Sequence, residues 1–210
     1  HMLGLLPLPG LDGLLDSAGK IKPDCFNING INMRKVFASP GAPDPNENDP
    51  PHEFCDVLMQ ICGQKAMQSA PGKYPSINNS GFIDSYSGQF KYPRAYNCRV
   101  HENDSVATPE DIMICFEEKD VPALATLARE YAVCDHWYSS MPGPTWPNRF
   151  FAHAASSAGL DDSPTTAEML DDYVVGQSFD NGTVFDSLNQ MQIPWEIFCG
   201  DFLPQSFALR

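Results

Sequence analysis

The chain has 210 residues, of which 42% are hydrophobic and 19% are charged, and its formal net charge is −14. This length suits one or two domains with a buried core, and the composition excludes disorder as the default state. The acidic balance excludes nucleic acid as a partner, because nucleic-acid binding needs clustered Lys and Arg, and it disfavours adsorption to anionic membranes. No stretch approaches the ~18 apolar residues of a membrane-spanning helix, so no transmembrane segment is predicted.

The first half of the chain is predicted to hold one clear helix between loops. Residues 21–49 are rich in Pro, Asn and Gly and indicate an extended loop. Residues 52–62 are amphipathic and predict a helix that ends at Gly63. The face of this helix that is expected to be buried carries Phe54, Val57, Leu58 and Ile61. Residues 71–96 are polar, aromatic and rich in turns.

The second half alternates helices and strands. Residues 120–131 predict a helix that Asp120 caps. Its expected buried side carries Leu124, Leu127, Ala128 and Tyr131. The elements expected after it are a strand at 132–138, helices at 148–158 and 184–191, and a buried strand at 195–198. This order favours a parallel sheet covered by helices, in which chemistry lies beyond the carboxyl ends of the strands.

Residues 141–149, Met-Pro-Gly-Pro-Thr-Trp-Pro-Asn-Arg, place one hydroxyl in a constrained turn. Pro142, Gly143 and Pro144 define an irregular backbone ahead of a helix whose first turn accommodates Pro147. Thr145 is then expected where unpaired N–H groups and the positive end of a helix dipole meet, which suits a phosphate. The alternative reading is a proline-rich loop before a helix.

The run from Tyr131 to Arg149 resembles the nucleophile segment of the phosphoesterase family, which includes phosphatidylcholine-type phospholipases C and related acid phosphatases. Residues 49–54, Asp-Pro-Pro-His-Glu-Phe, resemble the family's Asp-Pro-x-His element. Residues 80–84 resemble its Gly-Phe-aliphatic-Asp piece, and residues 183–197 resemble the helix and strand beyond the nucleophile. The resemblance implies an α/β, alkaline-phosphatase-like fold, with helices on both faces of a parallel-rich sheet that is incomplete in this chain.

The resemblance also implies roles for individual residues. Thr145 would be both the nucleophile and a metal ligand in a two-step phosphoryl transfer. His52 would either protonate the leaving alcohol or donate a hydrogen bond to the phosphate. Asn148 would either donate its amide to the phosphate or satisfy the start of the helix, while Tyr138 and Arg149 would contact a phosphoester or phospholipid substrate. His153 lies about two turns beyond Thr145 and is interpreted as structural.

The metal site of this family is expected to be incomplete in the chain. Residues 1–210 resemble a partial domain that lacks the family's amino-terminal Glu-Asn metal motif and its carboxy-terminal metal carboxylates. His1-Met2 is either the tail of that motif or a cloning remnant. The biological protein is therefore expected to extend beyond both ends. A divalent cation is expected in the complete enzyme, with none held tightly by these residues alone, because hard cations take several oxygen ligands.

Two acidic pairs, at residues 161–162 and 171–172, are interpreted as solvated turns rather than metal ligands. The chain has seven cysteines and three N-glycosylation acceptor triplets, which begin at Asn78, Asn103 and Asn181. Together these features favour an extracellular or secretory location.

Two classes of function remain open at this point. The first is a phosphoesterase, either phospholipase C-like or an acid phosphatase that acts on monoesters. The second is a non-catalytic binding or assembly module that keeps the fold of the family without its metal site.

Overall fold

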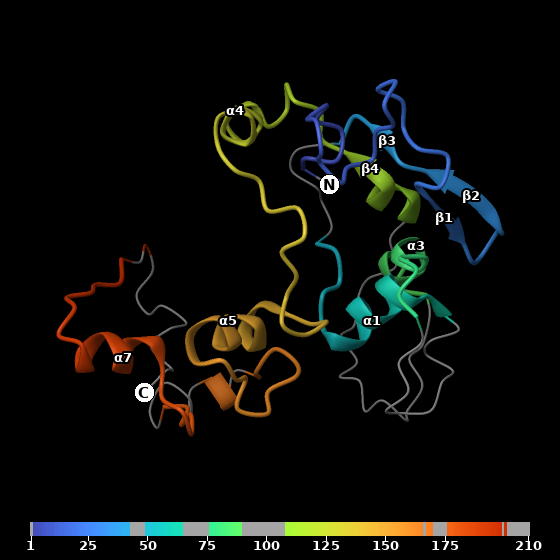
Figure 1. Ribbon diagram of the computed structural model, residues 1–210. Coiled ribbons are helices and arrows are strands. Elements are labelled where there is room, and N and C mark those ends of the chain that lie inside the picture. Colours follow the sequence, from blue (N-terminus) through green and yellow to red (C-terminus); the bar gives the residue numbers. More distant parts are fainter. Residues whose placement is uncertain are drawn as a thin grey trace. The chain divides into compact units, whose positions relative to one another are not determined.

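The computed structural model describes residues 2–42, 49–64, 76–89, 108–165, 167–169, 176–198 and 200. The chain divides into two compact units, which are described separately below. The first unit comprises residues 1–51 and 55–138, and the second comprises residues 52–54 and 139–210 (Figure 1). Among the helices in the described part of the chain, none is long and apolar enough to cross a membrane.

The strands of the first unit form two small sheets. β1 (Phe26–Asn29) pairs antiparallel with β2 (Arg34–Phe37), so that Phe26 lies opposite Phe37. β3 (Ser39–Pro40) pairs parallel with β4 (Ile114–Cys115). Within the described residues, parallel pairing is confined to this short ladder. The larger parallel-rich sheet implied by the resemblance therefore stays a prediction.

The predicted amphipathic helix is confirmed as α1 (Phe54–Cys62). It ends before Gly63, whose φ of 75° is the left-handed conformation expected of a helix-ending glycine. The predicted buried face was largely wrong, because Leu58 is its only fully buried member. The helix is instead rotated toward a face that buries Cys55, Asp56, Leu58, Met59 and Cys62.

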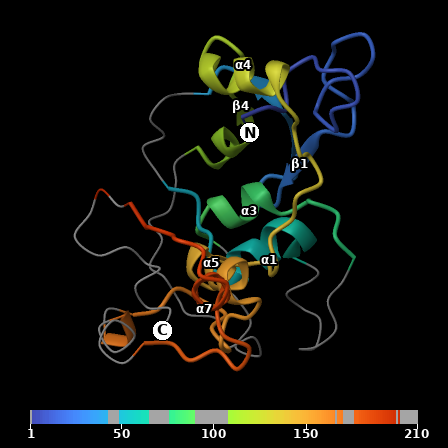
Figure 2. The same cartoon turned by 60° about the vertical axis from the view of Figure 1, so that its left-hand side comes forward.

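The Gly-Phe-aliphatic-Asp piece at 80–84 connects three elements of the first unit. It starts the short helix α3 (Phe82–Tyr86), which contacts β1 and lies beside it in both views (Figures 1 and 2). A Cβ atom at Gly81 would come within 2.0 Å of the Met59 carbonyl oxygen, so only glycine permits this approach to α1. Asp84 accepts a hydrogen bond of 2.8 Å from the Gly30 N–H, just beyond β1. These contacts give the piece a structural role.

The helix predicted at 120–131 is confirmed as α4 (Pro122–Glu130), which follows the 3₁₀ helix η2 (Pro109–Met113) and β4. The predicted cap was wrong: Val121 is the capping position, and the Asp120 carboxylate accepts the Glu117 N–H at 2.8 Å. The predicted buried face was right for Ala128 and wrong for its other three members. Ala125 and Ala128 are buried against leucines of the first eleven residues, whereas Leu124, Leu127 and Tyr131 are exposed. Small alanine side chains let the neighbouring loop approach the helix closely.

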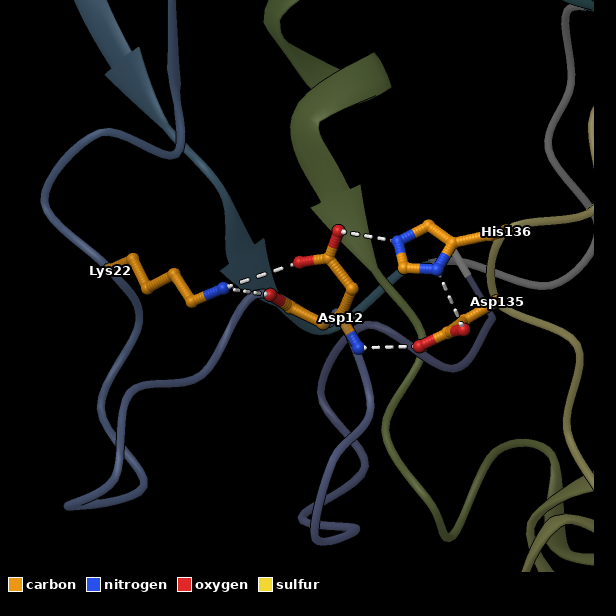
Figure 3. A network of polar contacts seen from close by, with 5 residues as sticks. Asp12, Lys22, Asp135 and His136 are labelled. Carbon is orange, nitrogen blue, oxygen red and sulfur yellow. Dashed lines mark hydrogen bonds and ion pairs between the residues drawn. The ribbon is translucent and has the colours of Figure 1, made fainter.

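The strand predicted at 132–138 is absent from the described structure, and this segment is irregular. Figure 3 shows a polar network that joins it to the amino-terminal loop. The Asp12 N–H donates to Asp135 at 2.7 Å, and His136 lies 3.5 Å from the carboxylates of both Asp12 and Asp135. Lys22 lies 3.7 Å from the other oxygen of Asp12. Side-chain contacts therefore join this segment to the amino-terminal loop in place of strand pairing.

The second unit is built on α5 (Thr145–Ala154) and α7 (Val184–Gln190). Its core consists of Trp146, Phe150, Ala154 and Phe179, with Leu160, Met169 and Phe185 packed against it. The predicted helix at 184–191 is confirmed, and Thr183 and Asp186 cap it reciprocally. The buried strand predicted at 195–198 was wrong, because this segment has no strand pairing and Phe198 is 86% exposed.

The cysteines of the first unit differ in state. Cys55 forms a disulfide bond, whereas Cys25, Cys115 and Cys134 are free thiols. Burial raises the pKa of the Cys115 thiol, so that thiol is protonated and unreactive at neutral pH.

Candidate active site

Thr145 is the first residue of α5, and its side chain is exposed. The helix begins three residues earlier than predicted. The extended backbone of Pro144 (φ −75°, ψ −178°) leads directly into it, and Pro147 fits the first turn, where its missing N–H costs nothing. The first N–H groups of an α-helix have no intrahelical acceptor, and the helix dipole is positive at this end. The hydroxyl of Thr145 is therefore presented to solvent at a position that favours an anion.

Asn148 holds the turn that precedes Thr145. Its Oδ1 accepts the Met141 N–H at 3.1 Å, and its Nδ2 lies 3.1 Å from the carbonyl oxygens of Met141, Gly143 and Pro144. An amide with both donor and acceptor atoms engaged in this way fixes the backbone of the turn. The geometry favours the second of the two predicted roles, in which Asn148 satisfies the start of the helix rather than the phosphate.

Replacing Asn148 with alanine is expected to loosen this turn and to lower the free energy of unfolding by about 1–3 kcal/mol, since buried backbone groups lose their partners. Faster amide hydrogen exchange at Met141 would report the local loss. Asn148→Asp is the discriminating variant: it keeps the acceptor for Met141 but sets a carboxylate against carbonyl oxygens, so it should be at least as harmful. Unchanged exchange at Met141 in both variants would contradict this role.

The backbone of Gly143 brings two distant segments to the Thr145 turn. A Cβ atom at Gly143 would lie 3.4 Å from the Asp161 carbonyl oxygen and 3.9 Å from the Phe54 Cα atom. Residues 52–54 accordingly belong to the same compact unit as Thr145. The structure therefore brings the predicted His52 segment to the predicted nucleophile turn, although about 90 residues separate them in the sequence. His52 itself is exposed.

Two carboxyl groups beside His52 and Gly143 were missed by the sequence reasoning. Glu53 is 8% exposed and Asp162 is 6% exposed, and their side chains are hydrogen bonded to each other. The interpretation of residues 161–162 as a solvated turn is therefore wrong for Asp162, although Asp161 is exposed. No repeating pattern in the sequence points to this pair of residues. The nearest signal is the position of Glu53 directly after the candidate catalytic histidine.

A cavity of the second unit is lined in part by two residues of α5, Arg149 and His153. Arg149 and His153 follow Thr145 at intervals of four residues, so the three side chains share one face of the helix. The cavity, of about 400 Å³, is lined by Arg149, His153, Phe185, Glu196 and Ile197. Burial, followed by the charge of Arg149, lowers the pKa of His153. Its buried Nδ1 has no hydrogen-bond partner within the described residues.

The other predicted residues are described as follows. Tyr138 is 77% exposed and stands at the end of the first unit, with its ring 6.3 Å from that of His136. The acceptor asparagines Asn78 and Asn181 are both exposed. Asn103 and the acidic pair at 171–172 lie outside the described residues.

The described residues do not by themselves make a metal centre around Thr145. Within the ranges that the structure describes, no group of three or more His, Cys, Asp or Glu side chains is arranged to hold a metal ion. The hydroxyl of Thr145 supplies one oxygen, whereas hard cations take six or more ligands. The assignment of Thr145 as a metal ligand stays a prediction.

Comparison with known proteins gives a consistent result. Residues 12–208 match the phosphoesterase family. Non-specific phospholipase C3 of Arabidopsis thaliana is 27% identical over 205 residues, which are 96% of this chain and 34% of the relative. Non-specific phospholipase C6 is 33% identical over 153 residues, covering 71% and 23% of the two chains. Non-specific phospholipase C1 is 28% identical over 212 residues, covering 100% and 33%.

The chain spans about one third of the length of the relatives C3 and C1. The family match extends over nearly all of it, including the Thr145 turn, the His52 segment and α7. On this match the chain belongs to the phosphoesterase family.

Proposed function

We propose that this chain carries the nucleophile of a phospholipase C-like hydrolase of phosphoric esters. The observation that supports this most directly is the exposed hydroxyl of Thr145, held at the start of α5 by a turn that Asn148 braces. The packing of Gly143 against the backbone of residues 54 and 161 adds the His52 segment to the same place. The three relatives described above are named as phospholipases C, which favours a phosphodiester of a lipid as the substrate.

In the proposed reaction, the Thr145 oxygen attacks the phosphorus atom and the bond between phosphorus and the leaving alcohol breaks. The hydroxyl proton passes to solvent, and His52 supplies a proton to the departing alkoxide or donates a hydrogen bond to a phosphate oxygen. Water then attacks the phosphothreonine, releases the phosphomonoester and restores the hydroxyl. The rigid turn contributes by holding the oxygen in place, which lowers the entropic cost of reaching the attacking geometry.

Arg149 is proposed to contact the phosphate of the substrate. The chain carries a net charge of −14, so an anionic phosphate is repelled at long range and needs a local cation. Arg149 is exposed one turn beyond Thr145 and lines the adjacent cavity. That cavity is the proposed site for the group attached to the phosphate. Tyr138 remains a proposed substrate contact.

A divalent cation is proposed for the complete protein, as expected for the family. The residues that the structure describes around Thr145 do not fit such an ion by themselves, since Thr145 offers one oxygen and no cluster of acidic or histidine ligands accompanies it within those residues. The additional ligands would have to come from other parts of the protein.

A secretory location is also proposed. Cys55 forms a disulfide bond, and disulfides persist mainly in oxidising compartments. Asn78 and Asn181 are exposed and begin acceptor triplets, as N-glycosylation requires.

The substrate class can be tested on the complete protein by comparing a choline phosphodiester with a simple aryl phosphate at equal concentration. We expect the higher kcat/KM with the diester, because the cavity beside Arg149 accommodates a second substituent on the phosphate. A preference for the monoester would support an acid phosphatase instead. Failure to hydrolyse either ester in the presence of divalent cations would support the non-catalytic module.

A further inference from the structure

Two buried carboxyl groups meet where the start of α1 lies against the loop after α5. Asp162 Oδ1 accepts the Phe54 N–H at 3.0 Å, and Glu53 Oε2 accepts the Ser163 N–H at 2.7 Å. The two side chains are also hydrogen bonded to each other. Each carboxyl group therefore binds the backbone of the other's segment, so residues 53–54 and 162–163 are joined by reciprocal contacts.

The pair cannot carry two negative charges without a large cost. Glu53 is 8% exposed and Asp162 is 6% exposed, so both side chains are largely removed from bulk water. Buried carboxyl groups that share a site favour a state in which only one is ionised, and the retained proton makes the hydrogen bond between them. Both backbone N–H groups keep an acceptor in this state, because each carboxyl still presents an oxygen to its partner amide.

The raised pKa of Asp162 agrees with a proton shared between the two carboxyl groups. Burial, and next the hydrogen bond with Glu53, raises the pKa of Asp162 from 3.8 to about 6. The charges of Glu53 and of the neighbouring Asp161 act in the same direction, whereas the Phe54 N–H acts against them. The exposed His52 is adjacent to Glu53, and the buried Asp56 follows in α1.

The joined segments carry the turn that presents Thr145. Gly143, two residues before Thr145, lies close to both segments: a Cβ atom there would be 3.9 Å from the Phe54 Cα atom and 3.4 Å from the Asp161 carbonyl oxygen. Displacement of either joined segment would remove one side of this support. Asn148 supports the same turn from α5, through its hydrogen bonds to Met141 and Gly143.

We propose that Glu53 and Asp162 form a carboxyl clasp, sharing one proton, that positions His52 and the Thr145 turn relative to each other. The two acids are positioning residues and do not touch the substrate. The catalytic part of this inference rests on the proposed phosphoryl transfer at Thr145, whereas the clasp itself rests on the contacts alone.

The clasp weakens as pH rises. Because the folded-state pKa of Asp162 lies above its unfolded value, the contribution of the clasp to stability is complete below about pH 4 and is lost as pH rises through about 6. Above that range both carboxyl groups are charged and repel each other. The wild-type protein should then show a loosened Thr145 turn in alkaline solution relative to mildly acidic solution.

Asp162→Asn and Asp162→Ala separate the clasp from general stability. Asparagine reproduces the protonated acid at every pH, since its amide oxygen can accept from Phe54 and its amide N–H₂ can donate to Glu53. Alanine removes both contacts. Asp161→Asn is the matched control, because it removes the neighbouring exposed charge without entering the pair.

Amide hydrogen exchange at Phe54 and Ser163 tests the clasp in the complete protein. The exchange rates of these two amides in the wild type, divided by those in Asp162→Asn at the same pH, should increase as the pH rises from 5 to 7. A ¹³C NMR titration of the Asp162 carboxyl group should show a midpoint near pH 6. Asp161→Asn should retain this acceleration with a slightly lower midpoint. An ordinary acidic midpoint for Asp162, or equal exchange in wild type and Asp162→Asn throughout, would overturn the proposal.

The pH profile of kcat tests the positioning role. Asp162→Ala should lower kcat on the order of 10- to 100-fold with little change in KM, because a small displacement of the reacting groups slows the chemical step more than it weakens substrate binding. Asp162→Asn should keep wild-type kcat at pH 5 and exceed wild type at pH 7. If Asp162→Ala fails to fold, Glu53→Gln can be measured in its place. The glutamine amide can donate to Asp162 at every pH, so this variant should also remove the pH dependence of kcat. Wild-type kcat profiles in these variants would overturn the positioning role.

The two proposals fail in distinguishable ways. If Thr145→Ala leaves hydrolysis intact, the proposed nucleophile is wrong, yet the exchange and titration measurements at Asp162 still decide whether the clasp exists. If the clasp measurements fail while Thr145→Ala abolishes hydrolysis, the nucleophile stands and the positioning role does not.

Discussion

Replacing Thr145 with alanine is expected to reduce hydrolysis by the complete protein by roughly 10⁴- to 10⁶-fold, the loss typical of removing a catalytic nucleophile. The fold should survive, because the Thr145 side chain is exposed and caps nothing: no side-chain cap hydrogen bond is present at the start of α5. The measurement compares kcat/KM on a choline phosphodiester and an aryl phosphate for wild type and variant. Unchanged thermal unfolding would confirm that only chemistry was lost.

Two further variants sharpen this result. Thr145→Ser should retain partial activity, since serine supplies the hydroxyl without the methyl group that restricts its rotamer. Thr126→Ala is a matched control: Thr126 is also an exposed helical threonine, and its hydroxyl donates to the Pro122 carbonyl oxygen at 2.8 Å. This control should keep full activity. If Thr145→Ala retains most of its activity on either ester, Thr145 is not the nucleophile and the family resemblance fails at its strongest point.

The second large effect is expected from Phe150→Ala, which should lower the free energy of unfolding of the second unit by about 3–5 kcal/mol. Phe150 is fully buried, and its ring meets those of Trp146 and Phe179 edge-on at centroid distances of 5.8 Å in both cases. Alanine would leave a cavity and remove both aromatic contacts. Because Phe150 lies in the helix that Thr145 begins, the mutation is also expected to loosen the support of the proposed nucleophile.

Denaturant unfolding would measure this loss, with Phe151→Ala as the matched control. Phe151 is only half-buried, so the same chemical change should cost clearly less. Hydrogen exchange along α5 should accelerate in Phe150→Ala and much less in Phe151→Ala. Equal costs in the two variants would show that the core of the second unit does not depend on the aromatic contacts of Phe150.

The helices of this protein were largely predictable, but the faces that they bury were not. Proline at 122 and 147 and glycine at 63 mark helix limits through backbone constraints that act locally, and α1, α4, α5 and α7 all appear near their predicted positions. In α4 the buried stripe is Ala125 and Ala128 rather than the leucines. Hydrophobicity alone predicts that the leucines are buried. The face that packs against the neighbouring loop is instead the one whose side chains are small enough for the loop to come close.

The predicted strands failed because strand formation depends on partners. Residues 132–138 have strand-like composition, but Asp135 and His136 are held by Asp12, more than 120 residues earlier in the chain. Residues 195–198 contain apolar side chains without a strand to pair with in the described structure. Alternation of side chains predicts a strand only where another strand supplies the hydrogen bonds.

The candidate site, like the fold, could be predicted from the sequence only in part. Thr145 and its helix start were recognisable from residues 141–149, because prolines and a glycine constrain the backbone locally and the motif matches a known family. The brace by Asn148 was one of two roles that this motif allowed. The carboxyl clasp of Glu53 and Asp162 was not recognisable, since both residues look like ordinary surface acids in the sequence. Their burial and shared proton arise only when segments more than 100 residues apart pack together and exclude water.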